Sequence, residues 1–303
     1  MGHIWLKILQ AITYCIGKLP LSVLYFFSTF FLYPLTYYVV RYRRKIVQKN
    51  LTLSFPEYSD SERKDLEKRF YRHFVDLLAE IIHGYAASDA EMAKRMIYDE
   101  KDKMMVEKLI EKYGGCFFML SHFGNWEWEA DLSKRFTNPK MHLVSVYRKL
   151  NSHVMDELMK SVRVKRGTTM CEMADLFRTM VRQSKEDRLY TYGMISDQKP
   201  SLFSQNYWTI FFHQKTAFLD GTERLARHFK YPVIYVHITS PQRGVYHNNF
   251  VVISEHPEQE EEFYITSQYA KLLKNNILES PHLWLWSHNR WKYKCPDDAI
   301  IRP

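Results

Sequence analysis

Hydrophobic and polar positions follow two different patterns along the chain, and the change falls near Gly114. Before that glycine, apolar residues over 66–82 recur three and four positions apart, which is the spacing of one face of an α-helix. Helix starts are predicted at Ser59 and Ser88, because each serine is followed three residues later by a glutamate, as in a capping box. A further helix is predicted over 103–113, because the glycine that follows it suits a helix C-terminus.

Short apolar and β-branched runs dominate the rest of the chain. Strands are predicted at 116–120, 142–147, 188–195, 231–238 and 249–254. Helical patterns separate several of these runs, at 153–162, 170–184 and 220–229, and a last helix is predicted at 260–279. Strands that alternate with helices predict the α/β fold class, with a mixed, largely parallel sheet flanked by helices.

The N-terminal region is distinguished by the uncharged stretch "LPLSVLYFFSTFFLYPLTYYVV" at 19–40. As a helix it would reach about 33 Å, close to the thickness of the hydrocarbon core of a bilayer. Pro34 is expected to kink that helix, and the preceding stretch at 3–18 has the helical spacing of an interfacial segment. The chain is therefore predicted to divide into a membrane anchor with a basic flank at 1–45 and a folded domain at 46–303. The alternative is a buried helical hairpin in a soluble protein.

The composition predicts that the protein binds an anionic partner. Hydrophobic residues make up 46% and aromatic residues 16% of the chain, and the formal net charge is +9. An excess of positive charge favours nucleic acid, phosphorylated metabolites or an anionic membrane surface as the partner. The basic cluster "RYRRKIVQK" at 41–49 directly follows the apolar stretch, where it would attract anionic lipid head groups. Because the sequence has no nucleic-acid-binding motif, anionic membrane lipids are predicted as partners and nucleic acid is not.

Candidate chemistry lies where the run "CFFML" leads into "SHFGNWEWE". In an open α/β sheet, functional groups collect just beyond the carboxyl ends of strands. His122 falls on this strand-to-helix loop, Gly124 allows a sharp turn, and Asn125 is a predicted helix N-cap. The loop can thereby bring the Glu127 carboxylate within hydrogen-bonding reach of the imidazole, which leaves the other ring nitrogen as a base for an alcohol proton. The alternative is that these two side chains, five positions apart, are only structural.

Other catalytic classes find no support in the sequence. No G-x-S-x-G motif is present, which argues against a covalent acyl-enzyme. Neither an H-E-x-x-H pattern nor a Cys/His ligand spacing is present, which argues against a zinc site. We therefore predict no metal and no cofactor, and we expect His288, which lies among tryptophans, to be a packing or interfacial residue.

The hexapeptide "HFGNWE" resembles the HxxxxE signature of the late lipid A acyltransferases, the lauroyl and myristoyl transferases of lipopolysaccharide synthesis. These enzymes are relatives of the glycerol-phosphate acyltransferases, whose version of the motif is HxxxxD. The resemblance extends over 5–292 and is carried by the segments "RRKIVQKNLTLSFPE", "YRHFVDLLAEI", "VYRKLNS", "SDQKP", "FFHQKTAF", "GTERLAR" and "WLWSHNRWK". An ordered set of this kind is far more specific than the hexapeptide alone.

The resemblance implies roles for the residues of the loop. His122 is implied to be the general base, and Glu127 is implied to orient it. Together they would deprotonate an acceptor hydroxyl, which then attacks an acyl thioester without a covalent acyl-enzyme. Asn125, or backbone N–H groups near the start of the helix, would help to bind the oxyanion.

The same resemblance implies substrate contacts elsewhere. Arg148 and Lys149 follow a predicted strand and are implied to contact a phosphorylated sugar lipid or the phosphopantetheine of the donor. From the residues alone, a solvated strand end is an equally good interpretation. Asp197 and Gln198 occupy the Asp-Gln motif of the family and are implied to line the same cleft. This chain departs from the family at His213, where glycine usually follows two phenylalanines, and the departure puts the shape of the acyl pocket in doubt.

The implied enzyme is a membrane-associated O-acyltransferase at the cytoplasmic face of a bacterial inner membrane, with 46–303 as its catalytic domain. It would move a fatty acyl group from acyl carrier protein, or from coenzyme A, to a hydroxyl of a phosphorylated lipid A precursor. Two alternatives stay open. One is the same chemistry on another lipid, such as a lysophospholipid or an aminolipid. The other is a non-catalytic membrane protein that binds acyl carrier or anionic lipid, and the intact site residues count against it.

Overall fold

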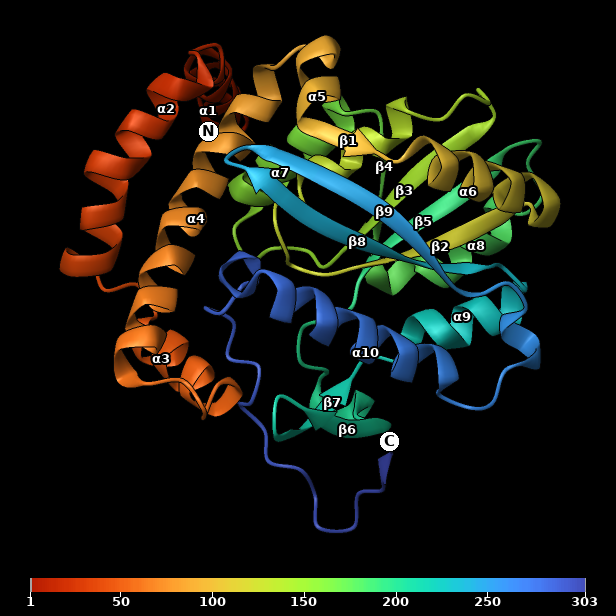
Figure 1. Ribbon diagram of the computed structural model, residues 1–303. Coiled ribbons are helices and arrows are strands. Elements are labelled where there is room, and N and C mark those ends of the chain that lie inside the picture. The colour runs from red at the N-terminus through yellow and green to blue at the C-terminus, as the bar shows by residue number, and fades with distance from the viewer. Residues whose placement is uncertain (1, 303) are drawn as a thin grey trace.

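A seven-stranded sheet lies at the centre of the molecule, flanked by helices, with the N-terminal helices along one side (Figure 1). The computed structural model describes residues 2–302. The strand order is β1-β9-β8-β2-β5-β3-β4, and neighbours run parallel except for the antiparallel pair β8–β9. The strands are β1 (Met96–Tyr98), β2 (Gly115–Leu120), β3 (Met141–Tyr147), β4 (Thr169–Glu172), β5 (Leu189–Ile195), β8 (Val233–Gln242) and β9 (Val245–Ser254). The predicted α/β fold with a mixed, largely parallel sheet is confirmed.

Most of the predicted helices are present, with small shifts of their ends. The α-helices beyond the N-terminal region are α3 (Arg44–Ser54), α4 (Asp60–Ala86), α5 (Asp89–Arg95), α6 (Glu100–Tyr113), α7 (His153–Lys165), α8 (Leu176–Gln183), α9 (Gly221–Phe229) and α10 (Tyr264–Glu279). Short 3₁₀ helices are η3 (Trp128–Lys134), η4 (Met173–Asp175), η5 (Leu202–Ser204), η6 (Pro257–Gln259) and η7 (Pro281–Leu283). Both predicted capping serines are confirmed, because Ser59 and Ser88 accept hydrogen bonds from the backbone three residues on.

The helix predicted over 170–184 is wrong in its first part. Residues Thr169–Glu172 form the edge strand β4, and α8 begins only at Leu176. The reason is tertiary pairing, since β4 adds to β3 in parallel register and this overrides the local helical pattern. The edge strand β1 is also absent from the predicted set, because three residues are too few to carry a periodic signal.

The central strand β2 determines where the site lies. All six of its residues are buried, as expected for a strand with parallel neighbours on both sides and covered faces. It ends at Leu120, and the chain emerges at the carboxyl edge of the sheet with His122 two residues later. Strand β5 ends beside it, because Leu120 and Ile195 are register partners.

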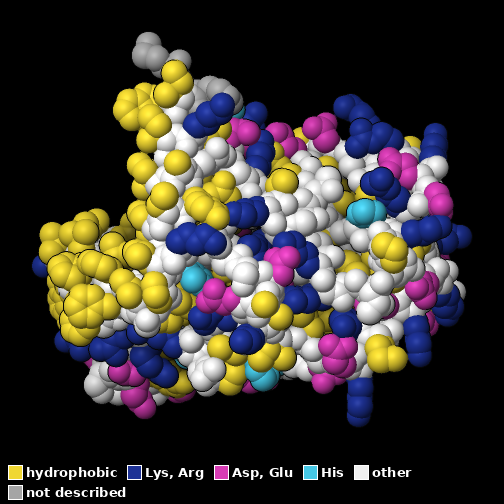
Figure 2. Space-filling view, turned by 90° about the horizontal axis from the view of Figure 1, so that it is seen from above, with side chains coloured by type: hydrophobic (Ala, Val, Ile, Leu, Met, Phe, Trp, Pro, Cys, Tyr) yellow, Lys and Arg dark blue, Asp and Glu magenta, His cyan; other side chains and the backbone are white. Residues whose placement is uncertain are grey.

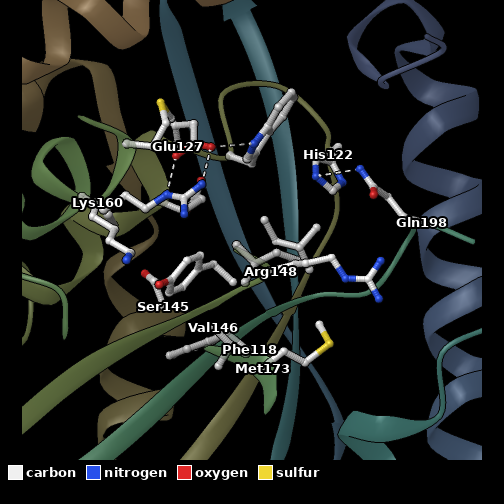
Figure 3. Close-up of a pocket in the computed structure, with 18 of the residues that line it drawn as sticks. Phe118, His122, Glu127, Ser145, Val146, Arg148, Lys160, Met173 and Gln198 are labelled. Carbon is white, nitrogen blue, oxygen red and sulfur yellow. Dashed lines mark hydrogen bonds and ion pairs between the residues drawn. The ribbon is translucent and has the colours of Figure 1, made fainter. Parts of the chain in front are cut away.

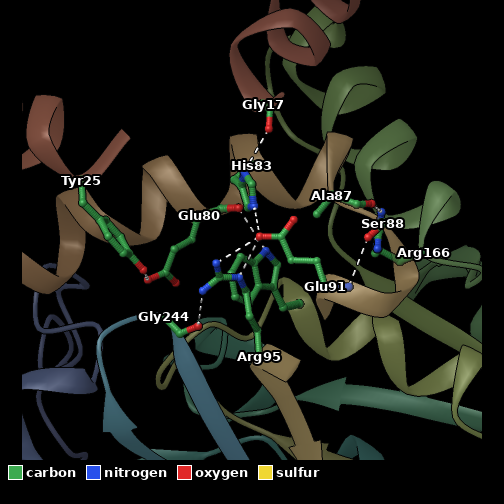
Figure 4. Close-up of polar contacts among 11 residues, drawn as sticks. Gly17, Tyr25, Glu80, His83, Ala87, Ser88, Glu91, Arg95, Arg166 and Gly244 are labelled. Atoms are coloured by element: carbon green, nitrogen blue, oxygen red, sulfur yellow. Dashed lines mark hydrogen bonds and ion pairs between the residues drawn. The ribbon is translucent and has the colours of Figure 1, made fainter. Parts of the chain in front are cut away.

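The N-terminal segment packs one of its faces along α4. It consists of α1 (Gly2–Gly17), α2 (Leu21–Phe27) and the π-helical turns η1 (Ser28–Leu32) and η2 (Leu35–Val39). Polar contacts join it to the rest of the molecule. His83 of α4 contacts the carbonyl of Gly17, in α1, through Nδ1 at 2.9 Å, and its Nε2 contacts the carboxylate of Glu91, in α5, at 2.8 Å (Figure 4). In addition, Tyr25 donates to Glu80 of α4 at 2.7 Å.

The opposite face of the N-terminal segment is open. Phe30 is 63% exposed and Val39 is 72% exposed, and Trp5, Phe26 and Phe31 are also exposed. The space-filling view shows hydrophobic side chains gathered there, with lysine and arginine side chains beside them (Figure 2). The segment is therefore not the buried helical hairpin of the alternative interpretation, because this face is exposed. A contiguous exposed apolar surface is typical of an interaction site.

The N-terminal helices differ in shape from the single predicted span. Within residues 2–302 no single helix is both long and apolar enough to cross a bilayer, whereas Ile4–Gly17 and Leu21–Val39 pass that test as a pair bent by 106°. The sharp bend thus lies near Pro20 and not at Pro34. Pro34 is accommodated by π-helical turns on either side of it, a familiar way to absorb a proline in a helix.

A small second sheet explains the departure at His213. Strands β6 (Tyr207–Phe211) and β7 (Gln214–Phe218) form a hairpin, and β10 (Ile301–Arg302) adds to its edge. The two loop residues, Phe212 and His213, have left-handed φ values of 48° and 62°. Such two-residue hairpin loops favour glycine, which has no Cβ to clash. The departure concerns this turn, and His213 does not line the cavity described below.

We predict that His213→Gly stabilises the protein. The left-handed conformation costs a residue with a Cβ about 1–2 kcal/mol, and the extra freedom of glycine in the unfolded chain returns about 0.5–1 kcal/mol of that. The expected net gain in the free energy of unfolding is about 0.5–1 kcal/mol, measured by denaturant titration. His213→Ala, which keeps the Cβ, is the control and should show no gain. An alanine variant as stable as the glycine variant would contradict the strain at this turn.

Candidate active site

The loop after β2 is held by backbone contacts from the C-terminal part of the chain. The Gly124 N–H donates to the Leu283 carbonyl at 3.0 Å, and the Leu285 N–H donates to the His122 carbonyl at 3.0 Å. Gly124 has a left-handed φ of 58°, as the predicted sharp turn requires. His73 of α4 contacts the Gly124 carbonyl through Nε2 at 3.3 Å, and burial lowers the pKa of this imidazole to about 3. These contacts with the loop therefore come from groups that stay neutral.

His122 is bonded to Asp197, which follows the neighbouring strand β5. The imidazole Nδ1 lies 2.6 Å from Asp197 Oδ1, and the His122 backbone N–H donates to Oδ2 at 3.0 Å. The Trp284 indole N–H donates to the same Oδ2 at 2.8 Å. Burial alone would raise the pKa of Asp197, but the imidazole and these donors outweigh it and hold that pKa below its ordinary value. Asp197 is therefore an ionised, buried carboxylate that fixes the ring of His122.

The other ring nitrogen of His122 faces the cavity. Gln198 Nε2 lies 3.2 Å from His122 Nε2 (Figure 3). An amide N–H can donate only to an unprotonated ring nitrogen, and Asp197 requires the proton on Nδ1, so both contacts select the same tautomer. Trp126 packs edge-on against the imidazole with a centroid separation of 5.0 Å. The Nε2 lone pair of His122 thus faces the cavity, where Gln198 donates to it and an acceptor hydroxyl could replace that contact.

Glu127 does not hold the imidazole, which corrects the pairing expected from the sequence. Its carboxylate instead forms a bidentate ion pair with Arg163 of α7, with both N–O distances at 2.7 Å (Figure 3). The Trp126 indole N–H donates to it as well, at 3.2 Å. Glu127 is the N-cap residue of η3, and Arg163 of α7 holds its carboxylate away from His122. Both Glu127 and Arg163 line the cavity.

Asn125 supports the loop from beneath. Its Oδ1 accepts from the Trp128 backbone N–H at 3.1 Å, but the N-cap residue of η3 is Glu127 and not Asn125 as predicted. Its Nδ2 donates to Glu80 of α4 at 2.8 Å, and the side chain is buried. Both polar atoms are therefore bonded within the protein, and Asn125 is not among the residues that line the cavity. The expected contact of this side chain with an oxyanion has no geometric support.

The cavity beside His122 measures about 500 Å³. Its apolar wall is formed by Phe118, Leu120, Ala130, Leu132, Leu143, Val146, Ile195, Leu219, Val236 and Leu285. Basic side chains line it too, and they include the predicted pair Arg148 and Lys149, which are exposed at the end of β3. Gln198 lines it as expected, whereas Asp197 lies behind His122. A largely apolar chamber lined also by a base and by cations suits a ligand that is part hydrocarbon and part anion.

Two features of the site are absent from the sequence-based prediction. Arg163 carries no recognisable signal, because it lies mid-helix in α7. Asp197 and His122 are both in the predicted set, but the contact between them is not. One rule points to it, since Asp197 follows the predicted strand at 188–195 just as His122 follows the one at 116–120. His288 packs as predicted, accepting from the Lys199 backbone N–H at 3.3 Å. Within residues 2–302 no group of three or more His, Cys, Asp or Glu side chains has the arrangement of a metal site.

Comparisons with known proteins show the family of the chain. The chain matches the family described as bacterial lipid A biosynthesis acyltransferase over residues 1–293. It is 22% identical to the lipid A biosynthesis palmitoleoyltransferase of Escherichia coli (strain K12), over 99% of this chain and 92% of that protein. The figures are the same for a lipid A biosynthesis acyltransferase of Shigella flexneri. The chain therefore belongs to the bacterial lipid A biosynthesis acyltransferase family, and it is an acyltransferase.

Proposed function

We propose that this enzyme transfers a fatty acyl group from the thioester of acyl carrier protein, or of coenzyme A, to a hydroxyl of a phosphorylated lipid A precursor. The observation that carries the proposal is the His122–Asp197 pair, with Nδ1 bonded to a buried carboxylate and Nε2 facing a largely apolar cavity. Family membership supplies the reaction class. The thioester is already activated, so the proton of the acceptor hydroxyl is the main chemical task left to the protein.

The proposed step is a direct acyl transfer. His122 Nε2 takes the proton of the acceptor hydroxyl while its oxygen attacks the thioester carbonyl carbon, and the carbonyl electrons move to oxygen. When the tetrahedral intermediate collapses, the C–S bond breaks and the leaving thiolate takes the proton from Nε2. Asp197 stays ionised throughout and stabilises the imidazolium that forms between the two proton transfers.

Substrate binding is assigned to the two parts of the cavity. The apolar wall would take the acyl chain, because burying apolar surface is favourable by about 25 cal/mol per Å². Arg148 and Lys149, exposed at the edge, would bind the phosphate of the acceptor or of the donor arm. Glu127 keeps its place in the proposed site, but it acts through Arg163: the ion pair holds the guanidinium in the cavity, where it would contact the polar part of a substrate.

The N-terminal segment, residues 1–45, is proposed to bind the cytoplasmic face of the bacterial inner membrane. Its exposed aromatic and aliphatic side chains would enter the lipid, and the basic residues of 41–49 would meet anionic head groups. The 106° bend between its helices favours insertion from one side over a straight crossing. A lipid acceptor could then reach the catalytic domain, 46–303, from the bilayer surface.

The proposal predicts acyl transfer from radiolabelled acyl–acyl carrier protein to a tetra-acylated lipid A precursor. Acyl–coenzyme A is assayed in parallel, and a lysophospholipid serves as the alternative acceptor. We expect His122→Ala to lower kcat by about 10²–10⁴, the usual contribution of a general base. Label that appears only in the lysophospholipid would overturn the lipid A acceptor. A wild-type rate in His122→Ala would overturn the mechanism.

Two isosteric variants separate the roles of the carboxylates in the same assay. In Asp197→Asn, the amide oxygen takes the position of Oδ2, because the His122 backbone N–H and the Trp284 indole N–H both donate there. The amide N–H₂ then takes the position of Oδ1 and donates to His122 Nδ1. The ring proton of neutral His122 must therefore lie on Nε2. We expect kcat to fall by about 10² or more. Glu127→Gln weakens the hold on Arg163 and should raise KM about tenfold with a smaller loss of kcat. A larger loss of kcat in Glu127→Gln than in Asp197→Asn would favour Glu127, and not Asp197, as the carboxylate that orients His122.

Membrane binding is tested by sedimentation with vesicles of phosphatidylethanolamine and phosphatidylglycerol. We expect the double variant Phe30→Glu, Val39→Glu to bind at least about tenfold more weakly, because each buried apolar side chain contributes about 1.5–3 kcal/mol. Phe177→Glu is the matched control, since Phe177 is 50% exposed but lies on α8, away from the N-terminal helices (Figure 1). Equal sedimentation of both variants would contradict the assignment of this surface.

A further inference from the structure

A buried carboxylate joins the N-terminal segment to the loop after β2, which carries His122. Glu80 of α4 is 1% exposed, and its Oε1 accepts from the Tyr25 hydroxyl of α2 at 2.7 Å (Figure 4). Its Oε2 accepts from the Asn125 amide at 2.8 Å and from the Tyr246 hydroxyl of β9 at 2.8 Å. The N-terminal helices, the loop after β2 and the central sheet therefore meet at one side chain.

The turn between β8 and β9 fixes the ring of Tyr25. The guanidinium carbon of Arg243, in that turn, lies 4.0 Å from the centre of the ring. The same guanidinium is bonded to α4, with its Nε 2.7 Å from Asp76 Oδ2. The next residue is Gly244, where a Cβ would lie 2.1 Å from the Tyr25 hydroxyl oxygen. The absence of a side chain at this position therefore leaves room for the hydroxyl to reach Glu80.

The loop after β2 is bonded to Glu80 at two points. Asn125, three residues after His122, donates to the carboxylate, and the Trp128 indole N–H donates to the Glu80 carbonyl at 3.1 Å. Asn125 and Trp128 are also joined to each other, because Asn125 Oδ1 accepts from the Trp128 backbone N–H. Neither Tyr25 nor Glu80 is among the residues that line the cavity. An effect of either residue on the reaction must therefore act through the position of the loop.

Loss of the Tyr25 hydroxyl would take this donor away from Oε1 of a buried carboxylate. A buried oxygen without a donor is costly, so the Glu80 side chain is expected to turn toward other donors and to withdraw Oε2 from Asn125. A misplacement of about 1 Å in a catalytic group can lower a rate by about 10². A hydroxyl on the N-terminal helices thus bears on a base that it does not touch.

We propose that Tyr25 and Glu80 are positioning residues for His122, so that the N-terminal segment takes part in catalysis as well as in membrane binding. The proposal rests on the proposed function in one respect, that His122 is the base. The two roles use different faces of the segment, since Tyr25 faces α4 whereas Phe30 and Val39 are exposed. Substitution can therefore separate them.

The test measures acyl transfer in detergent micelles that hold the acceptor, so that binding to a bilayer is not required. Tyr25→Phe removes only the hydroxyl that reaches Glu80. Tyr37→Phe is the matched control, because Tyr37 is 1% exposed in the same segment and its hydroxyl accepts from Arg44 at 3.0 Å instead. We expect kcat to fall about tenfold in Tyr25→Phe with KM unchanged, and both constants to keep their wild-type values in Tyr37→Phe. Equal losses in the two variants, or no loss in Tyr25→Phe, would overturn the proposal.

Substitutions at Glu80 supply a second readout. Glu80→Gln keeps an oxygen for Asn125 and Tyr246, and burial raises the pKa of Glu80 to about 7, so a neutral side chain suits this place. Glu80→Leu is similar in size and removes both acceptors. We expect kcat of Glu80→Gln to stay within about threefold of wild type and kcat of Glu80→Leu to fall by about 10².

The double variant Tyr25→Phe, Glu80→Leu shows whether the two residues act as one unit. It should be no slower than Glu80→Leu alone, because both changes act through the same carboxylate. Losses that multiply would mean two independent defects and would overturn the proposal. If Glu80→Leu does not fold, the comparison of Tyr25→Phe with Tyr37→Phe decides alone.

The rates are compared on whichever lipid the wild type acylates. If that lipid is a lysophospholipid and not the lipid A precursor, the proposed acceptor fails and the same comparison still decides the positioning roles. A full loss in His122→Ala with a wild-type rate in Tyr25→Phe would leave the proposed function standing and overturn the role of Tyr25. A wild-type rate in His122→Ala would overturn both.

Discussion

The contact between His122 and Asp197 joins the ends of two neighbouring parallel strands, and the arrangement of the site follows from it. Strands β2 and β5 are in register up to Leu120 and Ile195, so the residues just beyond them meet at one point of the sheet edge. There the buried carboxylate receives three N–H groups, two from His122 and one from Trp284. With the proton of the ring held on Nδ1, the lone pair of Nε2 is left toward the cavity. A different register between these strands would separate the pair.

The loop that carries His122 depends in turn on helix α4. Glu80 accepts from Asn125 at 2.8 Å through its carboxylate and from the Trp128 indole at 3.1 Å through its carbonyl. Gly84 permits this approach, because a Cβ there would lie 2.3 Å from the Trp128 indole nitrogen. The same carboxylate of Glu80 accepts from Tyr25 of the N-terminal segment. One helix therefore supports both the catalytic loop and the apolar segment proposed to meet the membrane.

The sequence allowed the frame of this site to be predicted, because buried strands and capped helices leave periodic signals. The strand before His122 and the sharp turn at Gly124 follow from local rules, and both are present. The helix start predicted at Asn125 falls two residues later, at Glu127. The partner of His122 does not follow from local rules. Glu127 is only five residues from His122 in sequence. The direction of its side chain, however, depends on where η3 begins and on Arg163, which is 36 residues away.

Long-range pairing accounts for the other differences as well. The edge strand β4 exists because β3 offers it a partner, and the bend near Pro20 exists because α1 and α2 both pack on α4. The left-handed φ of His213 could be anticipated only from the glycine that the family usually has there, since histidine itself carries no turn signal. For β4 and for the bend, the missing information was a contact between segments that are distant in sequence.

The measurement that tests the central claim most directly is nitrogen NMR of ¹⁵N-histidine-labelled protein, with His122 assigned by substitution. The account predicts that the His122 ring carries its proton on Nδ1 in wild type and in Glu127→Gln, and on Nε2 in Asp197→Asn. A ring whose tautomer changes in Glu127→Gln and not in Asp197→Asn would contradict it.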